Sequence, residues 1–277
     1  MRNLNLRLCL VSGICLIFLA QFGIVACWAE SVRSYVTTYS HYSGQTYHNV
    51  EEDESTAENA LLEVESSGEL SQGSFSAKAN VITNYGRHQT HSTATINNGF
   101  NEQVIALANS YFEDDWIVRT QTGDTWGEMT IGVTLHGNFE GDGNNLYYGV
   151  DCEGSGCKKV TLKNAPSDID EFSPPTQVAI VTIEYDIDTF FTIESTLEVN
   201  TYVGNYEEGV SKTGSIDFGH TAVITSLTLP AGHTLETASG TTYPLDYTPP
   251  GTDTGTTTAT TSGGGGGGGC FISNINK

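Results

Sequence analysis

Basic residues are scarce in this 277-residue chain, which has 11 Lys and Arg against 33 Asp and Glu. If residues 1–29 are removed, two arginines and no acid are lost, which leaves 9 basic and 33 acidic residues and a net charge of −24. Such a surface repels phosphate backbones and anionic lipid headgroups, so we expect no nucleic-acid partner. The charge suits solubility, divalent cations, and neutral or cationic partners.

Catalytic motifs are also missing. The sequence has no Gly-x-Ser-x-Gly, no Walker loop and no dinucleotide-binding fingerprint. A pair of carboxylates could hydrolyse a glycosidic bond, but with 33 acidic residues some pair will meet any spacing rule. We therefore predict no enzymatic activity, and a secreted glycoside hydrolase is the most distant alternative.

One uncharged, mainly apolar stretch stands near the N-terminus, from Leu8 to Val25, and two arginines precede it. Cys27 and Ala29 are small residues at the −3 and −1 positions before Glu30, and they complete the pattern of a signal peptide over residues 1–29. We therefore expect an exported protein, located outside the cell or on its outer surface. Residues 24–27 also resemble the bacterial lipobox, in which Cys27 would be acylated, and we expect membrane contact only through such an anchor.

The C-terminal segment, residues 248–277, is rich in Thr, Pro and Gly and includes an unbroken glycine run from Gly263 to Gly269. This composition predicts a flexible tail. The glycine run followed by Cys270, Phe271 and Ile272 resembles the start of the CFI-box segments of some exported bacterial proteins. A frayed tail with a spare thiol is the alternative.

Apolar and polar residues alternate in four segments of the middle of the chain, as half-buried antiparallel strands require. These segments are 131–139, 179–187, 191–203 and 223–229. Further strand candidates are 34–42, 74–83, 90–97, 103–112, 115–120, 146–150, 158–163 and 233–238. Strands at this spacing predict an all-β protein with a single antiparallel, jelly-roll-like β-sandwich over residues 30–247. The one helix candidate is residues 55–66.

Two cysteines lie inside the predicted domain, Cys152 and Cys157, separated by Glu-Gly-Ser-Gly. A glycine-rich loop of this length can turn tightly enough to pair them, and export would allow the bond to form. We predict a local disulfide, which stabilises the fold by about 2 kcal/mol on a chain-entropy estimate.

An acidic face is predicted where Glu184, Asp186 and Asp188 alternate along one strand. If the following strand forms a hairpin with it, Glu184 lies opposite Glu194. Directly opposed like charges destabilise a sheet, and a bound Ca²⁺ would remove that penalty. The four residues are therefore the candidate calcium ligands, and a solvated acidic surface is the alternative.

Two other patterns are weaker. Residues 140–144, Glu-Gly-Asp-Gly-Asn, have the alternating oxygens of a calcium loop but lack the distal Glu of an EF-hand, so we predict a plain turn. His88 and His91 would point to opposite faces of a strand, so they are poor partners for one metal ion.

Four aromatic residues flank Gly- and Asn-rich loops: Trp116, Trp126, Tyr147 and Tyr148. If they are exposed, sugar rings could stack on them, which makes a lectin-like carbohydrate-binding module the main alternative function. Core packing is the other fate of such residues.

The segment 217–244 contains Asp-Phe-Gly-His-Thr-Ala, then Leu-Pro-Ala-Gly, then Ser-Gly-Thr-Thr-Tyr-Pro. It resembles the last strands of exported β-sandwich proteins that carry PEP-CTERM and related choice-of-anchor tails. Residues 185–193 look like a second characteristic segment of that family, a strand corner, but without its Gly and Pro. The PEP motif and membrane helix of the family are absent. The resemblance implies a surface or matrix protein with no general catalytic site.

Together these observations predict an exported cell-surface or extracellular-matrix structural or adhesion protein without catalytic activity. Extracellular polysaccharide or other surface proteins are its expected partners.

Overall fold

The structure is a computed structural model that describes residues 30–42, 48–70, 73–99, 102–141, 143–167, 169–172 and 174–245. The predicted signal peptide, Cys27 and the Cys270 tail lie outside the described residues. Within the described part of the chain, no helix is long and apolar enough to cross a membrane.

The described residues form fourteen strands and one short 3₁₀ turn. In chain order these are β1 (Glu30–Tyr42), β2 (His48–Ser55), β3 (Leu61–Leu70), β4 (Gly73–Asn84), β5 (Arg87–Asn97), β6 (Glu102–Thr120), β7 (Trp126–His136), β8 (Asn138–Glu140), β9 (Asn144–Glu153), β10 (Cys157–Lys163), η1 (Ile169–Glu171), β11 (Thr176–Asp186), β12 (Phe190–Asn205), β13 (Lys212–Thr228) and β14 (His233–Thr237).

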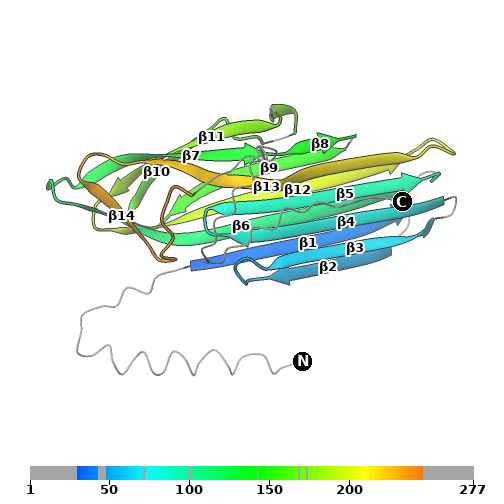
Figure 1. The fold of residues 1–277 in the computed structure, drawn as a ribbon, viewed down its shortest axis with the longest axis horizontal. Coiled ribbons are helices and arrows are strands. Elements are labelled where there is room, and N and C mark those ends of the chain that lie inside the picture. The colour runs from blue at the N-terminus through cyan, green and yellow to red at the C-terminus, as the bar shows by residue number, and fades with distance from the viewer. Residues whose placement is uncertain are drawn as a thin grey trace, which may run out of the picture.

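The strands form two antiparallel sheets that pack face to face, with most strands aligned along the long axis of the molecule (Figure 1). Sheet A has the order β2-β1-β6-β12-β9, with β14 paired to β6. Sheet B has the order β10-β11-β7-β13-β5-β4-β3, with β8 paired to β13. The predicted all-β sandwich is confirmed.

The core lies between the sheets because side chains alternate along each strand. In β12 every second residue is buried, from Phe191 to Asn205 without a break. The same period runs through β5 and β11. The buried apolar side chains of both sheets form one cluster, so the sandwich has a single core.

After β5 the chain passes from one sheet to the other at each connection except β7–β8 and β10–β11. Such alternation between the two layers is expected of a jelly-roll-like arrangement. The first part of the chain differs, because its consecutive strands pair as hairpins. β1 and β2 pair within sheet A, and β3, β4 and β5 pair within sheet B.

Each predicted strand segment coincides with a strand, although residues 187, 229 and 238 at the predicted ends lie just outside one. The segment 131–139 covers the end of β7 and the start of β8, which Gly137 separates, whereas 103–112 and 115–120 belong to the single strand β6. The helix prediction for residues 55–66 is wrong. A turn at Ala57–Ala60 joins β2 to β3, and Asn59 has a left-handed φ of 57°, which a helix does not accommodate. From Leu61 to Leu70 each residue of β3 has a partner in β4, so sheet pairing outweighs the helical spacing of a few apolar residues.

Candidate functional site

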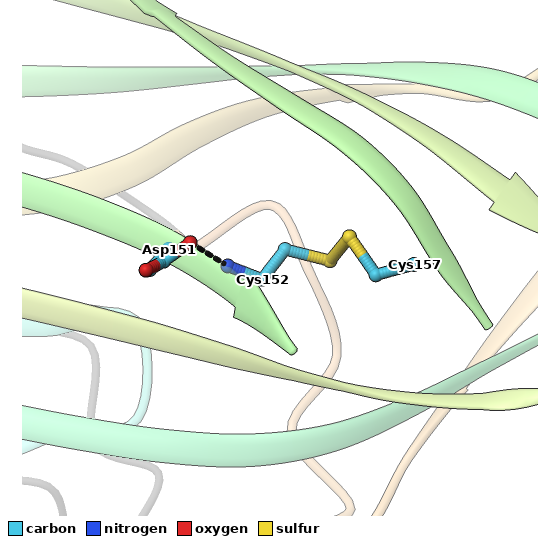
Figure 2. Close-up of a disulfide and its surroundings, with 3 residues drawn as sticks. All are labelled: Asp151, Cys152 and Cys157. Carbon is cyan, nitrogen blue, oxygen red and sulfur yellow. Dashed lines mark hydrogen bonds between the residues drawn. A yellow bond between two sulfur atoms is a disulfide. The ribbon is translucent and has the colours of Figure 1, made fainter. Parts of the chain in front are cut away.

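The predicted disulfide between Cys152 and Cys157 is present, with Cα atoms 6.1 Å apart (Figure 2). Cys152 belongs to β9 and pairs with Ile193 in sheet A, whereas Cys157 begins β10 and pairs with Tyr185 in sheet B. The bridge therefore joins the two sheets across the tight β9–β10 connection. The Cys152 amide also donates a hydrogen bond of 2.8 Å to the Asp151 carboxylate.

Three of the four candidate calcium ligands are ion-paired to basic side chains. Glu184 lies 3.4 Å from the Lys159 ammonium group and Asp186 lies 2.5 Å from that of Lys158. Asp188 accepts a hydrogen bond of 2.9 Å from the Arg119 guanidinium group. These cations reduce the carboxylate repulsion that a metal ion was expected to relieve.

The prediction of a hairpin that places Glu194 opposite Glu184 is wrong. β11 ends at Asp186 in sheet B, whereas β12 begins at Phe190 in sheet A. The chain changes sheets through a turn at Ile187–Asp188, where Asp188 has a φ of 57°. Glu184 therefore faces outward from one sheet and Glu194 outward from the other, because the alternating inner positions beside each are buried.

Glu194 has acidic neighbours of its own. It lies opposite Glu113 of β6 on one side and Asp151 of β9 on the other. Partial burial, together with these carboxylates and Glu153, raises the pKa of Glu194, while a hydrogen bond with Tyr111 opposes the rise. Across the described residues no group of three or more His, Cys, Asp or Glu side chains is arranged to hold a metal ion.

The four aromatic residues Trp116, Trp126, Tyr147 and Tyr148 do not form one exposed surface, because Trp116 and Tyr148 are core residues. Trp116 is fully buried, contacts Phe191 and Tyr243, and donates from its indole nitrogen to Asp114. Tyr148 is 3% exposed. For these two residues the sugar-stacking prediction is wrong, because the register of their strands turns both side chains inward.

Trp126 and Tyr147 are exposed, but they lie on different sheets. Trp126 begins β7 in sheet B and its ring is 5.7 Å from the Lys158 ammonium group. Tyr147 lies on the outer face of β9 in sheet A. The two rings therefore belong to opposite outer faces of the sandwich and provide no shared binding surface.

A buried polar network that the sequence did not predict runs between the two sheets. We call it the His88 seam, and it comprises Ser34, Thr83, His88, Ser110, Ser195 and Tyr148. The His88 ring forms hydrogen bonds with Ser110 at 2.7 Å and with Ser195 at 2.9 Å. Ser110 bonds in turn to Thr83, and Thr83 to Ser34, each at 2.7 Å.

The His88 seam ties the sheets together, because His88 and Thr83 belong to sheet B and the other members to sheet A. The His88 ring is 1% exposed and stacks on Phe112. Burial lowers the pKa of His88 to about 3, so the ring is neutral at physiological pH. His91 lies on the outer face of β5, as expected from its spacing, and is 3.7 Å from Asp217.

A second buried histidine closes one end of the sandwich. His233 at the start of β14 bonds to the Tyr185 hydroxyl at 2.9 Å and to the Asp124 carboxylate at 3.2 Å. An acid, an imidazole and a hydroxyl in series resemble a nucleophile relay. Burial raises the pKa of Tyr185 to about 12, however, and its side chain is fully buried, so this hydroxyl is a poor nucleophile.

The segment that carries the resemblance to exported sandwich proteins packs onto the end of β6. Ser239 donates hydrogen bonds from its amide and its hydroxyl to the buried Asp114 carboxylate, at 2.9 Å and 2.7 Å. Tyr243 packs against Trp116, with ring centroids 5.2 Å apart. Ser239 and Tyr243 thus hold the end of the domain against its core.

A cavity of about 320 Å³ opens at the far end of β12, and sequence reasoning missed it. Its walls are Gly141, Gly143, Tyr202, Val203, Gly204, Tyr206, Lys212 and Thr213, and we call it the tyrosine pocket. The residues come from the β8–β9 turn, the end of β12 and the start of β13. The only feature of the sequence that could have indicated this pocket is a pair of tyrosines, Tyr202 and Tyr206, on either side of Gly204. The pocket itself forms because the β8–β9 turn, the end of β12 and the start of β13 meet in the fold.

Comparison of the chain with family models, curated proteins and solved structures finds no match. The resemblance to the choice-of-anchor proteins therefore stays a prediction.

Proposed function

We propose that this is an exported, non-catalytic structural or adhesion protein of the cell surface or extracellular matrix. The observation that carries the proposal is the Cys152–Cys157 bridge, which ties the two sheets at one edge. Structural disulfides persist in oxidising compartments and are rare in the cytosol. The signal-like residues 1–29 and the acidic surface, which favours solubility, agree with this destination.

A structural role also agrees with how the chemically reactive side chains are arranged. The rings of His88 and His233 are both buried and hydrogen-bonded to core side chains, so neither is placed to contact a substrate. Extracellular polysaccharide or other surface proteins are the proposed partners.

Expression of the full chain in a bacterial host tests this proposal. Mass spectrometry should find a mature chain outside the cytoplasm that starts at Glu30, or at an acylated Cys27, with Cys152 and Cys157 oxidised. A Cys27→Ala variant separates the two starts. The control is a chain without residues 2–29, which should stay in the cytoplasm with both thiols free. If the wild-type chain stays uncleaved in the cytoplasm, the proposal of export is overturned. If the purified protein releases reducing sugar from a polysaccharide, the proposal of a non-catalytic role is overturned.

A further inference from the structure

The tyrosine pocket lies where the two sheets end together. Tyr202 and Tyr206 come from the end of β12 in sheet A and the residues just after it. Lys212 and Thr213 come from the start of β13 in sheet B. The volume of about 320 Å³ is in the lower range of small-ligand sites, so the pocket suits a compact ligand.

Hydrogen bonds hold the two tyrosine rings in place. The Tyr202 and Tyr206 hydroxyls are 3.3 Å apart, and the Gln103 side-chain amide donates to the Tyr206 hydroxyl at 2.9 Å. The Tyr206 side chain is nevertheless 57% exposed. An exposed aromatic ring that is fixed by polar contacts can receive a ligand at little cost in side-chain entropy.

The part of the pocket formed by Gly141 and Gly143 requires glycine. Gly141 and Gly143 both have a φ of 77°, which places them in the left-handed region. A β-carbon at Gly141 would lie 2.0 Å from the Thr213 carbonyl oxygen, and one at Gly143 would lie 1.8 Å from that of Tyr202. The turn is fixed further by the Tyr202 amide, which donates to the Gly143 carbonyl at 2.8 Å. The described walls of the pocket are therefore formed before any ligand binds.

The lining residues combine aromatic rings with hydrogen-bonding groups, namely two phenols and the lysine of Lys212. Thr213 also lines the pocket, and its hydroxyl is hydrogen-bonded to that of Thr95 at 3.1 Å. Sugar rings present one apolar face of C–H groups and a rim of hydroxyls, so they match both features. One lysine in a chain of net charge −22 does not make a site for a polyanion, because the long-range field repels it.

We propose that the tyrosine pocket binds a neutral sugar unit of a polysaccharide, stacked on Tyr206 and hydrogen-bonded to Lys212. The site differs from the four aromatic residues predicted from the sequence. The inference goes beyond the surface role proposed above and does not depend on it, because export can be measured without any glycan and sugar binding without any cell.

Calorimetric titration of the mature chain tests the site. The probes are neutral hexasaccharides of glucose, galactose, mannose and xylose, with hexagalacturonate as the anionic comparison. We expect at least one neutral probe to bind. Tyr206→Ala should weaken that binding about tenfold through loss of the stacking surface. Tyr206→Phe keeps the ring but loses the hydrogen bonds that fix it, so it should weaken binding less than Tyr206→Ala does. The matched control is Tyr147→Ala, which removes an exposed tyrosine from the outer face of sheet A and should leave binding unchanged.

The melting temperature of each variant shows whether it is folded, and Lys212→Met provides a second test through a side chain at the pocket wall. The proposal is overturned if the folded wild type binds none of the neutral probes or binds hexagalacturonate alone. It is also overturned if Tyr206→Ala and Lys212→Met both bind as the wild type does.

Discussion

The His88 seam and the Cys152–Cys157 bridge both tie sheet A to sheet B, but they do so with different chemistry. The seam lies inside the core and consists of hydrogen bonds between neutral side chains. The bridge lies at the edge formed by β9 and β10 and is one covalent bond. The first depends on an unprotonated imidazole and the second on oxidised thiols.

The comparison shows which conditions the sandwich requires. Burial of polar groups between the sheets stabilises the fold only while every group has a partner and none is charged. A bridge that closes a short loop adds stability whatever the pH, but it is lost when the thiols are reduced. We therefore expect the fold to be most stable near neutral pH with the disulfide oxidised.

Removal of the imidazole should have the largest effect. His88→Ala leaves the hydroxyls of Ser110 and Ser195 without their ring partner and opens a cavity beside Phe112. We expect a loss of about 3 kcal/mol in the free energy of unfolding, measured by urea denaturation. His91→Ala, on the outer face of the same strand, should cost less than about 0.5 kcal/mol. Equal losses for the two variants would refute the structural role of the seam.

Loss of the disulfide should have a smaller effect. The double variant Cys152→Ser, Cys157→Ser should be about 2 kcal/mol less stable than the oxidised wild type. Reductant should lower the stability of the wild type to that of the variant and leave the variant unchanged. If reductant changes the stability of neither protein, the bridge does not form in solution.

Acidification should give the smallest of the three effects, and it should weaken the His88 seam but not the Cys152–Cys157 bridge. Because the folded-state pKa of His88 is lowered to about 3, the unfolded chain binds a proton that the folded chain does not, and stability falls as the pH drops below 6.5. The expected loss is about 1 kcal/mol between pH 6.5 and pH 5.5, and it continues toward pH 3.

The pH experiment compares the wild type with His88→Ala, because the raised pKa values of Asp114 and Glu194 act in the opposite direction in both proteins. These carboxyl groups bind protons more tightly in the folded state, so they favour folding as the pH falls. The double cysteine variant should keep the pH dependence of the wild type. If His88→Ala shows the same pH dependence as the wild type, the buried ring is not responsible.

The strands could be predicted because their signal is local. The alternation in β12 identifies its inner face residue by residue, and the Gly-rich loop between Cys152 and Cys157 predicts their pairing. The fate of the aromatics could not be predicted in the same way. Trp116 lies four residues before the end of β6 and Trp126 begins β7. Trp116 is fully buried and Trp126 is 55% exposed, because the register of β6 turns Trp116 toward the core, where Tyr243 also packs against it.

The predicted calcium site required Glu184 and Glu194 to lie on paired strands of one sheet. Which sheet a strand joins is not decided by the residues near it in the sequence. Glu184 and Glu194 have the spacing of a hairpin, and a hairpin is the shortest way to pair consecutive strands. The turn at Ile187–Asp188 instead delivers the two residues to different sheets, so the proposed acidic pair does not exist. Each carboxylate has other neighbours, namely Lys159 for Glu184, and Glu113 and Asp151 for Glu194.

The amino-acid sequence by itself determined the all-β class, the inward and outward faces of the strands and the disulfide, because side-chain alternation and short-loop closure act over a few residues. Only the tertiary structure decided which sheet each strand joins, how His88 meets Ser110 and Ser195, and how Tyr206 and Lys212 come to line one pocket. Those arrangements join residues up to about a hundred positions apart, and their energy comes from packing and hydrogen bonds that exist only once both sheets have formed.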